Sequence, residues 1–142
     1  MPHAAAPADL TALFDAARAA RAHAHAPYSR FPVGAALRAA SGAIYRGCNV
    51  ENAAYPSGIC AETSAIAAMV CAGERRIAQL LVLGEGTDPL TPCGACRQRI
   101  LEFAGPDTLI YCGSASGPGL ARTMDELLPH AFGPERLAQG AP

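Results

Sequence analysis

The sequence of 142 residues predicts an α/β fold with three layers, in which helices cover both faces of a mixed, five-stranded sheet. Hydrophobic patterns with helical and strand-like spacing alternate along the chain, in the order helix, hairpin, helix, strand, helix, strand. The two central helices are each placed to cross over to a parallel strand. Because the chain contains no repeat and no linker, we expect a single domain over residues 1–142, with a core of about 8–133 and short flexible ends.

The first elements are an amphipathic helix and a β-hairpin. In residues 9–25 the apolar side chains recur at helical spacing, with an Asp able to cap the start and a Pro beyond the end. The segments 33–39 and 43–50 have compositions typical of strands. A Ser-Gly pair at 41–42 separates them and predicts a turn, so the two strands are expected to pair as a hairpin.

Helices and strands alternate in the middle of the chain. Residues 60–72 and 93–104 are expected to form helices, because each run is nearly free of helix breakers and is followed by a glycine. The apolar runs 77–83 and 108–112 come after these helices and predict strands. The intervening segment 51–58 is rich in turn-forming residues and predicts a loop.

The last part of the chain carries weaker signals. Segment 118–122 is a candidate fifth strand. Thr123 and Glu126 have the spacing of a capping box, which predicts the start of a short helix over 124–128 that Pro129 ends.

The charge pattern and the cysteine content exclude several classes of partner and location. The formal net charge is −1, and the eleven basic residues, all arginines, are scattered, so we expect no polymeric nucleic acid as a partner. Every apolar run is too short to cross a membrane, and we expect no membrane association. The six cysteines are too sparse for a disulfide scaffold, and the N-terminus lacks the pattern of a secretion signal. These features predict a cytoplasmic protein with reduced thiols.

Three of the cysteines stand at the starts of the two central helices. Cys60 begins the first of these helices, and Cys93 and Cys96 lie in the first turn of the second. A helix start has unpaired N–H groups and the positive end of the helix dipole, and both favour thiolates. If the two helix starts face each other, the three thiolates can hold a cation.

The pair Cys93 and Cys96 allows three interpretations. A thioredoxin-like redox dithiol would explain neither Cys60 nor the acid that follows it. A structural zinc site needs four ligands, and the other cysteines fall inside strand or helix patterns, where a buried thiol is the usual explanation. A catalytic zinc site needs three protein ligands and an open position for water, which Cys60, Cys93 and Cys96 match. Glu62 is within reach of that water and could act on it as an acid and a base. An acidic residue at this position is also common for another reason, because the positive end of the helix dipole stabilises its negative charge.

Longer stretches of the chain resemble the small homotetrameric, zinc-dependent cytidine deaminases. Two stretches, CAE and PCGACRQ, carry the zinc signature of the wider cytidine and deoxycytidylate deaminase superfamily. The resemblance narrows to cytidine deaminase through an N-x-E loop and a terminal ELLPxAF segment. The matching stretches are 27–37, 47–55, 60–62, 92–98 and 126–132. These stretches are distributed along nearly the whole chain, and the resemblance implies a cytidine-deaminase-like fold.

The resemblance implies a reaction and the residues at its centre. One zinc ion per subunit is held by Cys60, Cys93 and Cys96, and no organic cofactor is needed. Glu62 carries protons while cytidine or deoxycytidine is hydrolysed to uridine or deoxyuridine and ammonia. The implied role is pyrimidine salvage.

The resemblance also implies a nucleoside pocket that neighbouring subunits of a homotetramer complete. Asn49 and Glu51 suit ribose hydroxyls, whereas Tyr55 and Phe132 are contributed across subunit boundaries. Without the resemblance, Asn49 and Glu51 would be interpreted as the start of a turn, and the aromatic residues as packing. The residues implied to bind the substrate are Phe31, Asn49, Glu51, Ala53, Tyr55, Ala61 and Phe132.

One position departs from the family pattern. Many relatives have Arg directly after Cys-Ala-Glu, whereas this chain has Thr63. Three thiolates on a divalent cation leave a net negative charge, which makes the metal a poorer Lewis acid unless positive groups compensate. We hypothesise that the helix N-termini, together with Arg97 or Arg99, supply this compensation.

Two other functions stay open on the sequence alone. One is a zinc module without catalytic activity. The other is a related zinc deaminase that acts on free cytosine, a nucleotide or a compound such as blasticidin S. The loops have no cluster of basic residues for a phosphate, and Asn49 and Glu51 favour a substrate with a sugar.

Overall fold

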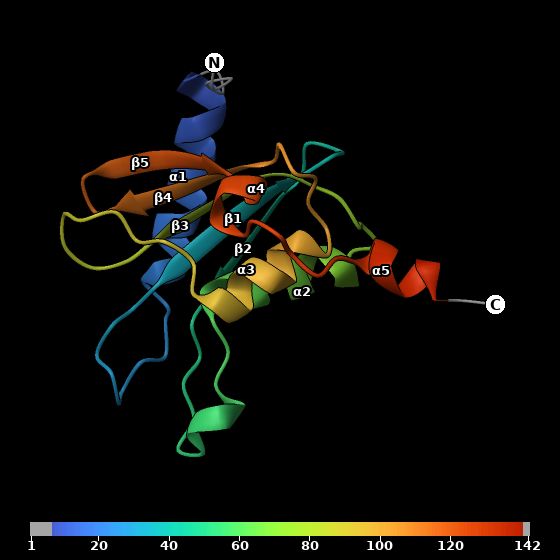
Figure 1. Cartoon of the computed structure of the whole chain (residues 1–142). Coiled ribbons are helices and arrows are strands. Elements are labelled where there is room, and N and C mark those ends of the chain that lie inside the picture. Colours follow the sequence, from blue (N-terminus) through green and yellow to red (C-terminus); the bar gives the residue numbers. More distant parts are fainter. Residues whose placement is uncertain (1–6, 141–142) are drawn as a thin grey trace.

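The computed structural model describes residues 7–140 and contains five strands and six helical segments in that range. The predicted flexible ends therefore lie partly outside the described residues. Figure 1 shows the arrangement of the elements. Their bounds are α1 Pro7–Arg21, β1 Gly34–Ala39, β2 Ile44–Cys48, η1 Tyr55–Ser57, α2 Ala61–Cys71, β3 Ile77–Leu83, α3 Gly94–Leu101, β4 Leu109–Ser114, β5 Gly117–Thr123, α4 Met124–Leu127 and α5 Pro134–Gln139.

The five strands form one mixed sheet with the order β2-β1-β3-β4-β5. β1 is antiparallel to both of its neighbours, β2 and β3, so β2 and β3 run in the same direction on either side of it. β3 and β4 are parallel, and β5 returns antiparallel to β4. The predicted hairpin, the two crossover helices and the mixed five-stranded sheet are confirmed.

Strand β3 lies in the middle of the sheet and is mostly apolar on both faces, which explains why its sequence is hydrophobic except at Gln79. Leu80 and Val82 point into the core beside α2, whereas Leu81 packs with α1 residues such as Leu13 on the opposite face. Successive side chains of a strand alternate between faces. Both faces of β3 are therefore covered by helices, as the three-layer prediction requires.

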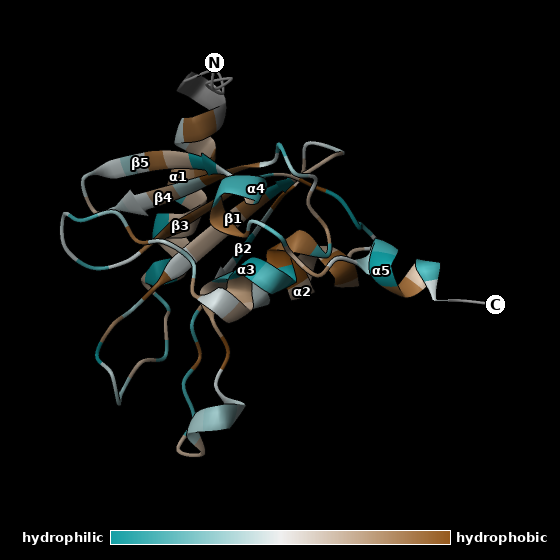
Figure 2. Cartoon of the chain, viewed as in Figure 1, coloured by the Kyte–Doolittle hydropathy of each residue, from teal (hydrophilic) through white to brown (hydrophobic). Residues whose placement is uncertain are grey.

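Two glycines let the helices lie close to the sheet. A Cβ at Gly34 on β1 would overlap the carbonyl oxygen of Ala17 on α1. Similarly, a Cβ at Gly47 on β2 would overlap the backbone of Ala61 and Ala65 on α2. Figure 1 shows α1 on one side of the sheet, with α2 and α3 on the other. Figure 2 shows α2 mostly in hydrophobic colours, in keeping with its position in the core.

Some element boundaries differ from those predicted. The first helix ends at Arg21, because His25 instead pairs with the loop after β2: its N–H donates to Asn49, and its carbonyl accepts from Glu51. The third helix ends at Leu101, several residues before the predicted end. Helices η1 and α5 lie in segments for which no helix was predicted.

The ends of the other helices follow the predicted signals. Gly73 has a left-handed φ of 92° and its N–H donates to the carbonyl of Val70, which ends α2. Thr123 and Glu126 form a complete capping box at the start of α4. Within residues 7–140, the helices are too short or too polar to cross a membrane.

Candidate active site

The starts of α2 and α3 lie next to each other at the same edge of the sheet. Both helices follow strands that run in the same direction, β2 and β3, so both begin at the carboxyl ends of these strands. Cys60 and Cys93 are the N-cap residues of α2 and α3, and both have extended backbone angles. This conformation turns the two side chains out of the helices and toward the space between them.

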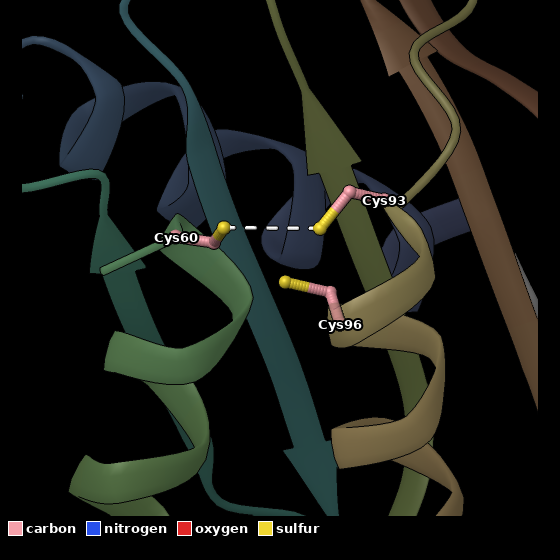
Figure 3. A group of neighbouring side chains, drawn as sticks. All are labelled: Cys60, Cys93 and Cys96. Carbon is pink, nitrogen blue, oxygen red and sulfur yellow. Dashed lines mark hydrogen bonds between the residues drawn. The ribbon is translucent and has the colours of Figure 1, made fainter. Parts of the chain in front are cut away.

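The three cysteines that the sequence singled out converge in this space. Figure 3 shows Cys60 at the start of α2 opposite Cys93 and Cys96 at the start of α3. The Sγ atoms all lie within 4.8 Å of one another, and those of Cys60 and Cys93 are 3.9 Å apart. A zinc ion about 2.3 Å from each sulfur in tetrahedral geometry places the sulfurs roughly 3.8 Å apart. The donor set and its spacing therefore fit one zinc ion.

No fourth ligand joins this cluster among the residues that the structure describes. The group of possible ligands contains only Cys60, Cys93 and Cys96. Cys71 is exposed near the end of α2, and Cys112 is buried in β4. A site with three protein ligands is the arrangement typical of catalytic zinc, whereas structural zinc usually has four.

Hydrogen bonding among the cysteines favours a thiolate at Cys60. The neighbouring thiols of Cys96 and Cys93, together with the charge of Arg99, lower the pKa of Cys60 to about 6, although burial opposes the shift. The interaction with Cys60, together with burial, raises the pKa of Cys96, whose thiol donates to Oε2 of Glu62 at 3.6 Å. Cys60 is therefore largely ionised at neutral pH, which suits a ligand for a cation.

Glu62 is buried beside the cluster on the first turn of α2. Its side chain is only 4% exposed, and its Oε2 lies 3.6 Å from the Sγ of Cys96. Burial raises the pKa of this carboxyl, and the negative charge on Cys60 acts in the same direction. A carboxyl with a raised pKa can take up and release protons at a pH closer to neutrality.

A cavity of about 560 Å³ opens above the cysteines. Its walls come from three loops, which precede β1, follow β2 and precede α3. Cys60, Cys93 and Glu62 contribute to its lining. Five of the residues predicted to bind substrate also line it: Phe31, Asn49, Glu51, Tyr55 and Ala61.

Two of the predicted substrate residues lie outside this lining. Ala53 is exposed in the loop before η1. Phe132 lies between α4 and α5, and its side chain is 59% exposed. Its carbonyl oxygen accepts a hydrogen bond of 2.8 Å from Gln98 on α3. Within one subunit, Phe132 is therefore hydrogen-bonded to α3, the helix that carries Cys96, but its side chain does not line the cavity.

Asn49 and Glu51 hold the neighbouring loop in place. The side-chain amide of Asn49 accepts the N–H of Val33 at 2.8 Å and donates to the carbonyl of Phe31 at 2.9 Å. Glu51 accepts the N–H groups of Tyr28 at 2.9 Å and Ser29 at 3.1 Å through Oε1, and the Ser29 hydroxyl through Oε2. The bonds from Ser29 are the main reason that the pKa of Glu51 is lowered.

Ser29 is a cavity residue that the sequence analysis did not single out. It stands inside the stretch PYSRFPVGAAL, but a serine before an arginine in a turn is too common to indicate a contact with a carboxylate 22 residues away. Leu90 and Thr91 also line the cavity and were not identified.

Comparison with known proteins agrees with this geometry. Residues 8–112 match the family described as the cytidine and deoxycytidylate deaminase zinc-binding region. The chain belongs to this family. The match confirms the resemblance drawn from the sequence motifs, and it runs from the start of α1 into β4.

Individual family members are similar along most of their length. The cytidine deaminase of Sporosarcina psychrophila is 43% identical over 133 residues, which cover 94% of this chain and 98% of the relative. The crystal structure of cytidine deaminase from Burkholderia pseudomallei has a TM-score of 0.82 and 44% identity, covering 86% of this chain and 98% of that one. The cytidine deaminase structure from Mycobacterium tuberculosis has a TM-score of 0.75 and 38% identity, with coverage of 87% and 96%.

Arg97 and Arg99, which follow the zinc ligand Cys96 on α3, have different surroundings in this deaminase-family chain. The guanidinium of Arg97 donates to the carbonyl of Pro92 at 2.9 Å and to that of Leu127 at 2.8 Å. These bonds connect the start of α3 to α4. Arg99 is exposed, and its charge contributes to the lowered pKa of Cys60 and acts in a small way against the raised pKa of Glu62. Of the two arginines, Arg99 therefore acts on the cluster electrostatically, whereas Arg97 has a structural contact.

Thr63 occupies the position directly after Glu62 on α2. Its Oγ1 is buried, and among the described residues it has no hydrogen-bond partner. It brings no charge to the site, so the three thiolates depend on other groups for compensation.

Proposed function

We propose that this protein catalyses the zinc-dependent hydrolytic deamination of cytidine and deoxycytidine, which yields uridine or deoxyuridine and ammonia. One observation carries the proposal: Cys60, Cys93 and Cys96 form an open three-ligand cluster beside the buried Glu62, at the floor of a cavity of about 560 Å³. The relatives described above, which the chain matches nearly end to end, are named cytidine deaminase. A cavity of this size accommodates a nucleoside.

Zinc held by the three thiolates would supply a Lewis acid that makes water a stronger nucleophile near neutral pH. Glu62 would provide the proton transfers that the reaction needs. As a base it takes a proton from water, and as an acid it delivers that proton to ring nitrogen 3 of cytosine. The hydroxide left from the water adds to carbon 4. Glu62 then takes the proton of the new hydroxyl group and gives it to the amino group, so that the bond between carbon 4 and the amino nitrogen breaks, ammonia leaves and carbon 4 becomes a carbonyl.

The burial of Glu62 supports this double role. A carboxyl with an ordinary pKa would hold its proton too weakly to act as an acid near neutral pH. Burial raises the pKa of Glu62, which makes both the protonated and the ionised form accessible. The same burial keeps bulk water away from the transferred protons.

Asn49 and Glu51 would recognise the sugar. Both side chains line the cavity and have their orientation set by the loop that carries Phe31. Glu51 offers a negatively charged acceptor for a hydroxyl group, and a substrate without that hydroxyl would leave the acceptor unpaired. Phe31 supplies an aromatic surface on the cavity wall.

We further infer that the active assembly is a homotetramer in which neighbouring subunits complete each site. Tyr55 is 74% exposed and Phe132 is 59% exposed, and exposed aromatic side chains of this size are typical of contact surfaces. Phe132 would then close on the pyrimidine in a neighbour's cavity, and Ala53 would contribute its backbone to the pocket. A cytoplasmic location and a role in pyrimidine salvage stay predictions from the sequence.

The decisive experiment follows ultraviolet absorbance while the purified protein is incubated with cytidine, deoxycytidine, cytosine, CMP or blasticidin S. Zinc is quantified in the same sample. We expect the two nucleosides to be consumed, and the free base and the nucleotide to be poor substrates. Zinc present at one ion per chain without consumption of a nucleoside would refute the proposal and favour a zinc module without catalytic activity. Preferential turnover of blasticidin S would instead show that the protein is a blasticidin S deaminase.

A further inference from the structure

A single hydroxyl group connects two loops of the cavity. The Oγ of Ser29 donates to Oε2 of Glu51 and accepts the backbone N–H of Phe31 at 3.0 Å. The direction of the first bond follows from charge, because an ionised carboxylate only accepts hydrogen bonds. Arg30, in the middle of this turn, has a left-handed φ of 56°, which is unfavourable for a residue with a side chain. The bonds of Ser29 therefore hold a turn that backbone preference alone disfavours.

These contacts leave Glu51 with limited capacity for a ligand. An ionised carboxylate has about four acceptor positions, two on each oxygen. On Oε1 both positions are taken, by the N–H groups of Tyr28 and Ser29. On Oε2 one position is taken by the Ser29 hydroxyl, which leaves one open position on an oxygen whose direction Ser29 determines. Glu51 is half-buried and lines the cavity, so this position is available to a bound molecule.

We propose that Ser29 is a positioning residue for sugar recognition: its hydroxyl holds the Glu51 carboxylate so that one acceptor position points at a hydroxyl of the nucleoside. The inference rests on the proposed nucleoside deamination and adds to it a residue that acts through Glu51 without being required for the chemistry at the base. A negatively charged acceptor with one open position selects a substituent with an O–H donor. It repels a phosphate at the same place.

Loss of the Ser29 hydroxyl has a predictable effect on pH dependence. The hydroxyl is the largest cause of the lowered pKa of Glu51, so its removal raises that pKa toward the ordinary range. Binding of a hydroxyl donor then weakens at a higher pH than in the unaltered protein as the solution is acidified. His25 faces Glu51 and lowers its pKa through charge. The other titratable groups on the cavity wall are Tyr28, Tyr55, Cys60, Cys93 and Glu62.

The test compares Ser29→Ala and Ser29→Thr with the unaltered holoenzyme from roughly pH 4 to pH 7, a range that includes the ordinary pKa of a Glu carboxyl, about 4.3. The KM is measured for cytidine and for 2′,3′-dideoxycytidine, and the Kd for uridine is measured by calorimetry. We expect Ser29→Ala to raise the KM for cytidine and the Kd for uridine by about three- to tenfold, the usual effect of one hydrogen bond. The KM for the dideoxy analogue should change less than twofold, roughly, because it cannot use the open acceptor. Ser29→Thr should restore the unaltered values.

Ser41→Ala provides a matched control. Ser41 also hydrogen-bonds to a carboxylate and lowers its pKa, that of Glu74, but neither residue lines the cavity. This variant should leave KM, Kd and their pH dependence unchanged. In a Glu51→Gln background, Ser29→Ala should have little further effect, because the carboxylate through which Ser29 acts is gone.

The outcomes separate this inference from the proposed function. Equal loss of affinity for cytidine and the dideoxy analogue in Ser29→Ala would mean that Ser29 only maintains the loop, and would overturn the inference while deamination stands. An unchanged KM would also overturn it. If the unaltered protein binds uridine in a Ser29-dependent way but consumes no nucleoside, the deamination proposal fails and the role of Ser29 is supported. If it binds no nucleoside at all, both fail.

Discussion

The Sγ of Cys96 on α3 lies 3.6 Å from Oε2 of Glu62 on α2, although the two residues are 34 positions apart in the chain. A zinc ligand and the proposed proton carrier are therefore buried next to each other. The contact exists because both helices begin at the same edge of the sheet. A molecule held near the metal would consequently be within reach of the carboxyl that must move its protons.

Loss of one cysteine ligand should remove the metal and lower stability. We expect Cys96→Ala to reduce zinc from about one ion per chain to a small fraction, because three sulfurs are the whole protein contribution to the site. The melting temperature should fall by about 10 °C, since bound metal stabilises only the folded state. Elemental analysis and calorimetry measure these effects. Cys71→Ala, at an exposed cysteine, is the control and should retain zinc.

Glu62→Gln should separate the proton transfers from metal binding. The amide keeps the shape of the side chain but cannot accept and release protons, so kcat should fall by about 10²- to 10⁴-fold. Zinc content should stay unchanged, because Glu62 does not belong to the ligand group. Steady-state kinetics with zinc analysis on the same samples provide the measurement. Glu102→Gln replaces an exposed carboxylate and serves as the control. Retention of full activity in Glu62→Gln would exclude a role of Glu62 in proton transfer.

Arg97 and Arg99 should differ in what they contribute. Arg99→Gln removes a charge that acts on Cys60 and Glu62, and we expect zinc loss to a chelator to become about two- to fivefold faster. Thr63→Arg should slow this loss, because it brings a positive charge next to the cluster. Arg97→Gln should instead reduce the free energy of unfolding by about 1–3 kcal/mol, because two backbone carbonyls lose their donor.

The pH–rate profiles of the same variants provide a second measurement of charge compensation. Arg99→Gln and Thr63→Arg should shift the profile in opposite directions, since one removes and the other adds positive charge near the site. If the profiles of Arg97→Gln, Arg99→Gln and Thr63→Arg all match that of the unaltered protein, neither arginine compensates the thiolate charge.

The assembly can be tested through Phe132. We expect light scattering to give the mass of a tetramer, and Phe132→Ala to lower kcat/KM by about tenfold if this side chain completes a neighbour's site. Mixing Phe132→Ala with the inactive Glu62→Gln should restore part of the activity, because some sites then combine an intact Glu62 with an intact Phe132 from a neighbour. A monomer with full activity would contradict this prediction.

The capping box at the start of α4 should make stability depend on pH. The backbone N–H of Thr123, and to a lesser degree its hydroxyl, lowers the pKa of Glu126 below its ordinary value of 4.5. The stabilisation is therefore present above that value and is lost as the pH falls through the lower pKa of the folded state. The difference in melting temperature between the unaltered protein and Glu126→Gln should shrink from pH 7 to about pH 3. A difference that is constant over this range would exclude a contribution from the ionised carboxylate.

Local signals were sufficient for most of the secondary structure. Strand β3 and the capping box of α4 agree with their predictions because a hydrophobic run or a capping pair acts over a few neighbouring residues. The predictions failed where distant backbone groups competed. Helix α1 ends early because His25 pairs with the loop containing Glu51.

The alternation of helices and strands, the family and the residues of the candidate zinc site could all be identified from the amino-acid sequence. Residue types and their spacing carry this information, because helix starts favour thiolates and an acid in the first turn of a helix has a defined direction. The partners of Arg97 and Ser29 became visible only in the folded chain, where Arg97 donates to the carbonyl of Leu127 and the Ser29 hydroxyl donates to Glu51. These relationships depend on how separate loops and helices pack, and no spacing along the chain encodes the distances between them.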